Sequence, residues 1–236
     1  MTEIIFLLPR SEIFLSKEPS AEKYFKRRLG AQEFLNNSDR WRLWLGDCPL
    51  SELTPMPKVM QRVQSVRQFR LESKSLPSQK IAQSPTRFDV ENMLSTDSLL
   101  IPGVSSERRA FVPIGFISPD VLISNLTRVV PNATPYDFGI LSSTMHNACI
   151  CYTYGRLKSD FRYSASIVYN NYAWPMDITD AQRAAVNAAA QGVLDAWAVH
   201  QHGDDAASLA DLYNPTTMPA NLNAAHKALD KAVDAG

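Results

Sequence analysis

The feature that most constrains the fold of this chain is a change of pattern at Pro175. Before it, short apolar runs are interrupted by proline and glycine, as in "LLIPGVSSERRAFVPIGFIS". After it, apolar residues recur at helical spacing, as in "DITDAQRAAVNAAAQGVLDAWAVH". Short strands followed by helices are typical of α+β proteins. We therefore expect a mixed-sheet domain with flanking helices over residues 1–175 and a small all-helical segment over residues 176–236.

The first part is expected to combine helices with short strands. Helical patterns lie at 16–36, 52–75 and 136–157. Strand patterns lie at 40–45, in several runs within 97–125, at 155–163 and at 166–175. The polar stretch 74–97 follows neither period, so we expect a long loop there, and long loops in compact domains are often functional.

Two helices are expected in the C-terminal part. Thr179 and Gln182 have the spacing of a capping box, and apolar residues at helical spacing follow them. A second helix is expected to begin near Pro219. Its buried face is indicated by residues in helical register, namely Leu222, His226, Leu229 and Val233.

The chain has no net charge, but its two parts carry opposite charges. Residues 1–175 contain 21 Lys and Arg against 16 Asp and Glu, whereas residues 176–236 contain 3 against 8. Between Lys58 and Arg87 there are seven basic residues and one acidic residue, Glu72. Such a segment is either a site for a polyanion or an ordinary solvated helix and loop, and the charge pattern leaves both interpretations open.

The stretch "GRLKSDFRYS" alternates charged residues with less polar ones. An extended strand directs every second side chain to the same face. We therefore expect one face of this strand to carry a row of ionic side chains, namely Arg156, Lys158, Asp160 and Arg162.

Three common catalytic motifs are absent from the sequence. The nine glycines are isolated, so there is no Gly-x-Gly loop to hold a nucleotide phosphate. There is no Gly-x-Ser-x-Gly nucleophile motif, and the carboxylates show no pairing that indicates a general acid and base. Taken alone, the chain does not look like an enzyme.

Cysteine and histidine usage predicts neither a metal site nor a disulfide framework. The three cysteines lack disulfide-framework spacing, which agrees with a reducing compartment. No apolar run approaches the roughly 20 residues of a membrane span, so we expect a cytoplasmic protein without a membrane partner. Two groups lack the spacing of metal sites: Cys149 and Cys151 with His146, and His200 with His202.

Several motifs, in order, resemble the target-recognition region of the MmeI-type (type IIL) adenine-specific DNA methyltransferases and restriction–modification enzymes. They are "EPSAEKYFKRRLGAQEFLN", "RWRLWL", "RVQSVRQFRLESKS", "SERR", "VPIGFISPDV", "FGILSSTMHNA", "GRLKSDFRYS" and "IVYNNYAWP". "SLADLYNPTTMPANLNAAHKALDKAVD" is similar to the family's C-terminal helical segment. The resemblance covers nearly the whole chain.

The resemblance implies that Lys158 and Asp160 set one base of a DNA target. In the major groove a lysine donates to guanine and an aspartate accepts from the amino group of cytosine, and a correct pair contributes about 1–3 kcal/mol of discrimination. Other groups are expected to contact the DNA backbone, which supplies affinity but little sequence information. These backbone contacts are Arg156, Arg162, Ser105, Ser106, Arg108, Arg109, Arg67 and Arg70.

In this family the methyl-transfer domain precedes the target-recognition region. That domain carries a glycine-containing loop for S-adenosylmethionine and an Asn-Pro-Pro-aromatic motif, and neither occurs in this sequence. We therefore expect no cofactor in this chain, and S-adenosylmethionine only in a methyltransferase domain supplied in cis or in trans. The chain is then a truncated gene, a separately encoded subunit or an expressed fragment. Its other expected partner is double-stranded DNA.

The sequence departs from the family pattern at four positions. The family pattern has Trp where Cys149 stands, basic residues at Cys151 and Gly103, and Pro at Ala173. Fewer basic residues should weaken phosphate contacts.

The leading hypothesis is a sequence-specific DNA-recognition module that lacks the catalytic domain. The alternative is a structural or protein-interaction remnant that no longer binds DNA. The missing motifs disfavour a third hypothesis, an active methyltransferase.

Overall fold

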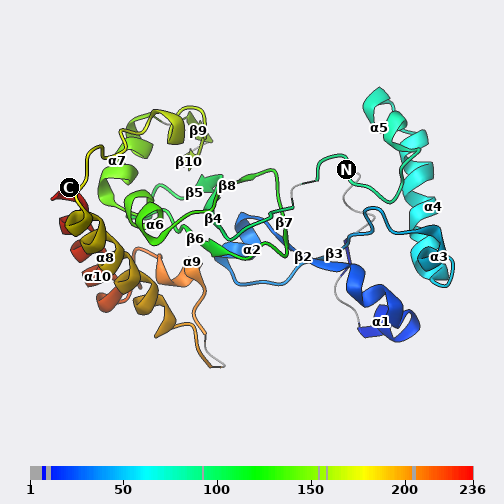
Figure 1. Ribbon diagram of the computed structural model, residues 1–236, viewed down its shortest axis with the longest axis horizontal. Helices are drawn as coiled ribbons and strands as arrows, with labels where there is room; N and C mark the ends of the chain where they lie inside the picture. The colour runs from blue at the N-terminus through cyan, green and yellow to red at the C-terminus, as the bar shows by residue number, and fades with distance from the viewer. Residues whose placement is uncertain are drawn as a thin grey trace. The chain divides into compact units, whose positions relative to one another are not determined.

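The computed structural model confirms an α+β fold (Figure 1). It describes residues 7–8, 12–91, 93–153, 155–157, 159–203 and 206–235. None of the helices in these ranges is long and apolar enough to cross a membrane.

The chain divides into two compact units. Unit 1 comprises Met1–Leu29, Asp39–Met93 and Asp120–Ile123, and unit 2 comprises Gly30–Ser38, Leu94–Pro119 and Ser124–Gly236. The expected domain boundary at residue 175 stays a prediction, since unit 2 contains residues from both sides of it.

Unit 1 contains a four-stranded sheet of order β1–β3–β2–β7. Its strand β2 is antiparallel to β3 and parallel to β7, so that Arg27 pairs with Trp41 on one side and with Val121 on the other. The strands are β1 (Leu7–Leu8), β2 (Phe25–Leu29), β3 (Trp41–Leu43) and β7 (Val121–Ile123).

Helix α4 (Pro57–Leu71) confirms a helix within the pattern expected at residues 52–75. It begins at Pro57, and the Glu18 carboxylate accepts hydrogen bonds from the backbone N–H groups of Lys58 and Val59, which have no partner within the helix. Val63 and Val66 are buried in the core of unit 1. The helices of this unit are α1 (Glu12–Lys17), η2 (Pro19–Tyr24), α3 (Leu50–Leu53), α4 (Pro57–Leu71) and α5 (Leu76–Ile81).

Two expectations for unit 1 are wrong. Residues 16–36 do not form one helix, because the middle of this stretch is strand β2, which buries Phe25 and Leu29 and pairs with strands on both sides. Residues 74–97 are not wholly a loop, because α5 lies within them. The strand expected at 40–45 is confirmed as β3.

Unit 2 contains two three-stranded sheets, of order β6–β4–β8 and β5–β10–β9. All the pairings in both sheets are antiparallel. The runs expected within 97–125 are therefore confirmed as short strands. The strands are β4 (Ser98–Pro102), β5 (Val104–Ser105), β6 (Gly115–Ile117), β8 (Thr127–Pro131), β9 (Gly155–Leu157) and β10 (Asp160–Arg162).

The helices of unit 2 include the expected C-terminal segment. Thr179 and Gln182 form the capping box at the start of α8, and α8 lies alongside α10 (Figure 1). The helices are α2 (Ala31–Leu35), α6 (Pro135–Leu141), α7 (Thr144–Thr153), η3 (Tyr169–Asn171), α8 (Asp180–Ala198), α9 (Leu209–Leu212) and α10 (Ala220–Asp234).

Helix α6 approaches α8 and α10 closely through a glycine. A Cβ atom on Gly139 would lie 2.9 Å from Val186 and 3.2 Å from Leu229. Beside this contact, Phe138 packs edge-on against Trp197, with 5.7 Å between ring centroids. The C-terminal helices therefore share one hydrophobic core with the sheets of unit 2.

Helix α10 also holds the start of α7. The Asp230 carboxylate accepts hydrogen bonds from the backbone N–H of Thr144, at 2.8 Å, and from its hydroxyl, at 2.6 Å. A side chain from another element thus satisfies a free N–H at the N-terminus of α7.

Three further expectations need correction. Residues 136–157 form two helices, α6 and α7, separated at Ser142–Ser143, and are followed by β9. Residues 166–175 contain the short helix η3 and no strand within this fully described range. Residues 155–163 form a hairpin and not one extended strand.

Candidate nucleic-acid interface

The sheet β5–β10–β9 carries the expected base-reading stretch. Its register pairs Asp160 with Leu157 and pairs Phe161 with Arg156. The expected single row of four ionic residues on one extended strand is wrong, because residues 155–157 and 160–162 belong to two antiparallel strands. Asp160 and Arg162, two residues apart on β10, still share one face.

A polar cavity of about 360 Å³ lies beside this sheet. Asp160 contributes from β10, while Ser106 and Arg109 contribute from the turn after β5. The structure thus brings together three of the residues expected at the DNA interface. The full lining is Ala31, Gln32, Leu35, Asn36, Val104, Ser106, Arg109, Asp160 and Ala210.

Helix α2 provides a wall of the polar cavity that sequence reasoning missed. Gln32 and Asn36 lie one turn apart on this wall, and the Asn36 side-chain amide donates to the backbone carbonyl of Gln32 at 2.9 Å. Amides at this spacing in "GAQEFLN" fit an ordinary exposed helix face, so only the tertiary arrangement reveals their location.

Arg109 is half-buried in the polar cavity. Burial lowers the pKa of its guanidinium from the ordinary value, and the negative charge of Asp160 acts in the opposite direction. The two side chains therefore interact electrostatically across the cavity. Arg108, the adjacent residue, is exposed.

A tight turn lies between β5 and Arg109. The Arg109 N–H donates to the Ser106 carbonyl at 3.2 Å, and the Arg108 N–H lies 3.4 Å from the Ser106 hydroxyl. Ser105 is only 4% exposed, and its hydroxyl has no hydrogen-bond partner within the described ranges. Ser105 is thus buried in the fold and does not offer its side chain to a ligand at the surface.

Gly103 lies directly against the Ser124–Thr127 turn. A Cβ atom on Gly103 would lie 2.0 Å from the carbonyl oxygen of Leu126, which is far inside van der Waals contact. A basic residue at this position, as in the family pattern, is incompatible with this arrangement. Leu126 at the tip of the turn is 73% exposed.

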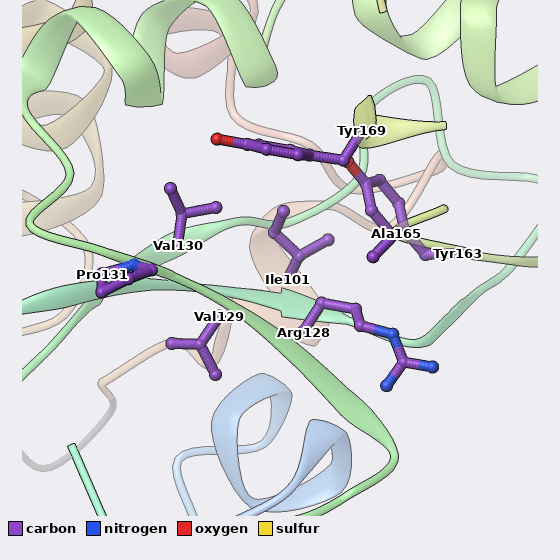
Figure 2. A pocket seen from close by; sticks show the side chains of 8 residues that line it. All are labelled: Ile101, Arg128, Val129, Val130, Pro131, Tyr163, Ala165 and Tyr169. Carbon is purple, nitrogen blue, oxygen red and sulfur yellow. The ribbon is translucent and has the colours of Figure 1, made fainter. Parts of the chain in front are cut away.

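A second cavity, of about 120 Å³, lies by strands β4 and β8. Figure 2 shows the Tyr169 ring above the side chains of Ile101 and Val130. Arg128 lines the same cavity, and its guanidinium donates to the carbonyls of Asn125 and Thr127, both at 3.1 Å. This cavity is mainly apolar, and Arg128 braces the neighbouring turn.

The arginines expected on α4 have different surroundings. Arg67 is exposed. Arg70 is 2% exposed, and its guanidinium donates to the carbonyls of Ile81 at 3.2 Å, Ser84 at 3.0 Å and Arg87 at 2.6 Å. Arg70 thus holds the α5 segment in place, and burial prevents the expected contact with a DNA backbone.

Two expected site residues lie wholly or partly outside the described residues. Lys158 lies outside the described residues, as does the side chain of Arg156.

His146 is fully buried, and its Nδ1 lies 2.7 Å from the Leu141 carbonyl oxygen. In the ranges that the structure describes, no group of three His, Cys, Asp or Glu side chains is arranged to hold a metal ion.

The short sheets of unit 2 place Asp160 beside a polar cavity that Ser106 and Arg109 also line. The chain belongs to the MmeI family: residues 3–176 match the MmeI target recognition domain, and residues 178–236 match the MmeI C-terminal domain. These matches confirm the resemblance drawn from the sequence motifs.

Two relatives are considerably longer than this chain. It is 32% identical over 231 residues to DNA methyltransferase A of Bacillus subtilis (strain 168), covering 98% of this chain and 26% of that protein. It is 45% identical, with a TM-score of 0.91, to the type IIL restriction–modification enzyme MmeI in a structure of that enzyme with DNA. That match covers 98% of this chain and 30% of MmeI. The chain thus spans about a quarter to a third of these relatives.

Proposed function

We propose that this chain recognises a short sequence in double-stranded DNA, as the specificity part of an adenine-specific DNA methyltransferase or restriction–modification system. The observation that carries the proposal is the match to MmeI, at 45% identity and a TM-score of 0.91, in a structure that contains DNA. At this similarity the backbone of this chain closely follows that of the matching part of MmeI. The polar cavity beside β10 is a second argument, because it is lined by polar and charged side chains, among them Asp160, Ser106 and Arg109.

In this proposal Asp160 and Lys158 read bases. A carboxylate accepts a hydrogen bond from the amino group of cytosine, and an ammonium group donates to guanine. Asp160 is suited to this role because it is half-buried beside a cavity and is not engaged in a hydrogen bond or salt bridge with any described residue. Lys158 retains its role by resemblance alone.

Exposed basic residues are proposed to contact phosphates. Arg162 on β10, Arg108 in the turn and Arg67 on α4 are exposed, as phosphate-contacting arginines must be. Ser106 lines the polar cavity beside the turn and is retained as a backbone contact. Arg156 is retained by its position in β9.

We propose that a methyltransferase domain, in cis or in trans, is the catalytic partner. S-adenosylmethionine would bind to that domain. The recognition module would place the target adenine of the DNA at that domain's active site. The adenine must leave the stack of the DNA duplex before it can be methylated. The relatives' additional length supports this proposal, because this chain covers only 26% and 30% of them.

Selection from a randomised duplex pool tests the proposal. The chain is incubated with the pool at two salt concentrations, and the retained fraction is sequenced. We expect one short motif to be enriched, with retention that falls steeply as salt rises, because phosphate contacts release counterions. Salt-sensitive retention without a motif would contradict autonomous recognition. No retention at either salt concentration would favour the alternative, a remnant that no longer binds DNA.

A further inference from the structure

Asp160 and Arg109 line the same polar cavity with opposite charges. Strand pairing places Phe161 opposite Ser105. Because β10 and β5 are antiparallel, Asp160 lies one step along this ladder, beside Ser106. The backbone N–H of Arg109 donates to the Ser106 carbonyl at 3.2 Å, so the turn brings Arg109 back toward the start of β10. A basic and an acidic residue from segments far apart in the sequence are thus held at one place.

The charges of Arg109 and Asp160 act on one another. Burial lowers the pKa of the Arg109 guanidinium, and the negative charge of Asp160 raises it. Neither side chain forms a hydrogen bond or a salt bridge with any residue in the described ranges. The Asp160 carboxylate therefore keeps its oxygens available as acceptors while a positive charge lies nearby.

A carboxylate that reads cytosine must approach a polyanion. B-DNA carries about one negative charge per 1.7 Å of its axis, and these phosphates repel an ionised aspartate. The carboxylate also loses water when it enters the groove, which costs free energy unless a hydrogen bond or an opposite charge replaces that water. A guanidinium near the carboxylate offsets both costs, provided that it does not occupy the carboxylate oxygens.

Arg109 is better placed for this role than the neighbouring arginines. Arg108 and Arg162 are exposed, and water and salt strongly screen an exposed charge. Arg109 is half-buried in the polar cavity, so its effect on Asp160 is screened less. The two exposed arginines remain suited to phosphate contacts.

We infer that Arg109 is a positioning residue that acts through Asp160: its positive charge enables the Asp160 carboxylate to enter the major groove and accept a hydrogen bond from cytosine. The inference rests on the proposed DNA-recognition function and replaces the backbone contact expected for Arg109. It leaves the role proposed for Lys158 toward guanine unchanged. Arg109 itself need not touch the DNA.

The first test measures base preference for the full chain and two variants, using the randomised duplex pool. We expect Arg109→Gln to reduce the preference at the base pair that Asp160→Asn affects by about 5-fold, the size of one partly screened charge pair. Preferences at other positions should be unchanged. Arg108→Gln, on the adjacent exposed residue, should weaken retention of all sequences by a similar factor and leave the motif intact.

Two further variants distinguish this role from a structural one. In the Asp160→Asn background the carboxylate charge is gone, so adding Arg109→Gln should change the same preference by less than about 2-fold. Arg109→Lys keeps the positive charge and should retain most of the preference. If Arg109→Gln does not fold, as judged by circular dichroism, Arg109→Met takes its place, because it keeps the apolar part of the side chain without the charge.

Three results would overturn the inference. An equal loss from Arg109→Gln in the Asp160→Asn background would show that Arg109 acts independently of the carboxylate. An equal loss from Arg109→Lys would show that its charge is not what matters. Uniform weakening of every sequence by Arg109→Gln would identify Arg109 as a phosphate contact. The proposed function would stand in all three cases, whereas failure of the unaltered chain to select any motif would remove both it and this inference.

Discussion

The Nε2 atom of His226 lies 2.8 Å from the hydroxyl of Tyr213 in the core of unit 2. The Trp197 indole N–H donates to the same hydroxyl at 3.0 Å, and the His226 ring stacks on Phe111 with 3.9 Å between centroids. A polar chain within an apolar core is stable only when its groups are paired and uncharged. Protonation of the buried His226 ring would therefore destabilise the packing of the C-terminal helices around it.

We expect the protein to lose stability as the pH falls from about 6.5 to about 4. Burial lowers the pKa of His226 and of His146, each fully buried, from 6.5 to about 4. The unfolded chain therefore binds protons in this window that the folded chain does not, so the free energy of unfolding decreases as pH decreases. Each histidine should contribute a loss of about 2 kcal/mol at pH 5. Urea unfolding at pH 7 and pH 5 measures the effect.

Single replacements separate the two histidines from other titrating groups. His226→Gln should lower stability at pH 7 and flatten the dependence between pH 7 and pH 5, because the titrating ring is gone. His202→Gln changes an exposed histidine and serves as the control. An equally steep dependence in His226→Gln and in the unaltered chain would contradict a role for His226.

Gly103→Ala should destabilise the protein by about 2 kcal/mol or more. The added Cβ would meet the Leu126 carbonyl oxygen at 2.0 Å, and this neighbour is backbone, so strand β4 or the turn must shift. Gly192→Ala is the matched control, since a Cβ there meets nothing within 4 Å and the residue lies inside α8. The control should stabilise the protein by roughly 0.5–1 kcal/mol. Thermal unfolding of both variants decides the comparison.

Arg70→Met should destabilise unit 1, whereas Arg67→Met should not. Removing the Arg70 guanidinium leaves the carbonyls of Ile81, Ser84 and Arg87 without this donor, at a cost of about 2 kcal/mol or more. Arg67 is exposed, so its replacement should change stability by no more than about 0.5 kcal/mol. Proteolysis within the α5 segment should also become faster in Arg70→Met. Equal stability of the two variants would show that Arg70 does not hold this segment.

Local pattern accounts for the parts of the fold that the sequence predicted correctly. Helices α4, α8 and α10 bury residues at helical spacing, and the α8 capping box lies within four consecutive residues, Thr179 to Gln182. The sequence of strand β2, "FKRRL", has no strong strand pattern, so the flanking helical pattern wrongly predicts a helix there. Its conformation depends on pairing with β7, which lies much further along the chain. Pairing between distant segments cannot be predicted from the spacing of apolar residues within one of them.

The candidate site likewise depends on contacts between segments that are far apart in the sequence. Asp160, Ser106 and Arg109 were expected at the DNA interface because of motif resemblance, and the fold gathers them at one cavity. Their grouping with Gln32 and Asn36 required the placement of α2. The chemical identity of Arg70 indicated a phosphate contact, but burial against backbone carbonyls determines its role. Residue type predicts what a side chain can bind, and only tertiary structure determines what it meets.

Arg67→Ala should weaken DNA binding without changing the recognised motif. Because Arg67 is an exposed cation on α4, we expect one fewer phosphate contact, a similar loss of affinity for every sequence, and a salt slope reduced by about 1. Lys231→Ala on α10 is the control, since this exposed lysine belongs to the acidic C-terminal segment and should leave both quantities unchanged. Fluorescence anisotropy with a labelled duplex, measured over a range of salt concentrations, gives both slopes. An unchanged slope in Arg67→Ala would remove α4 from the interface and would confine the phosphate contacts to the basic residues near β10.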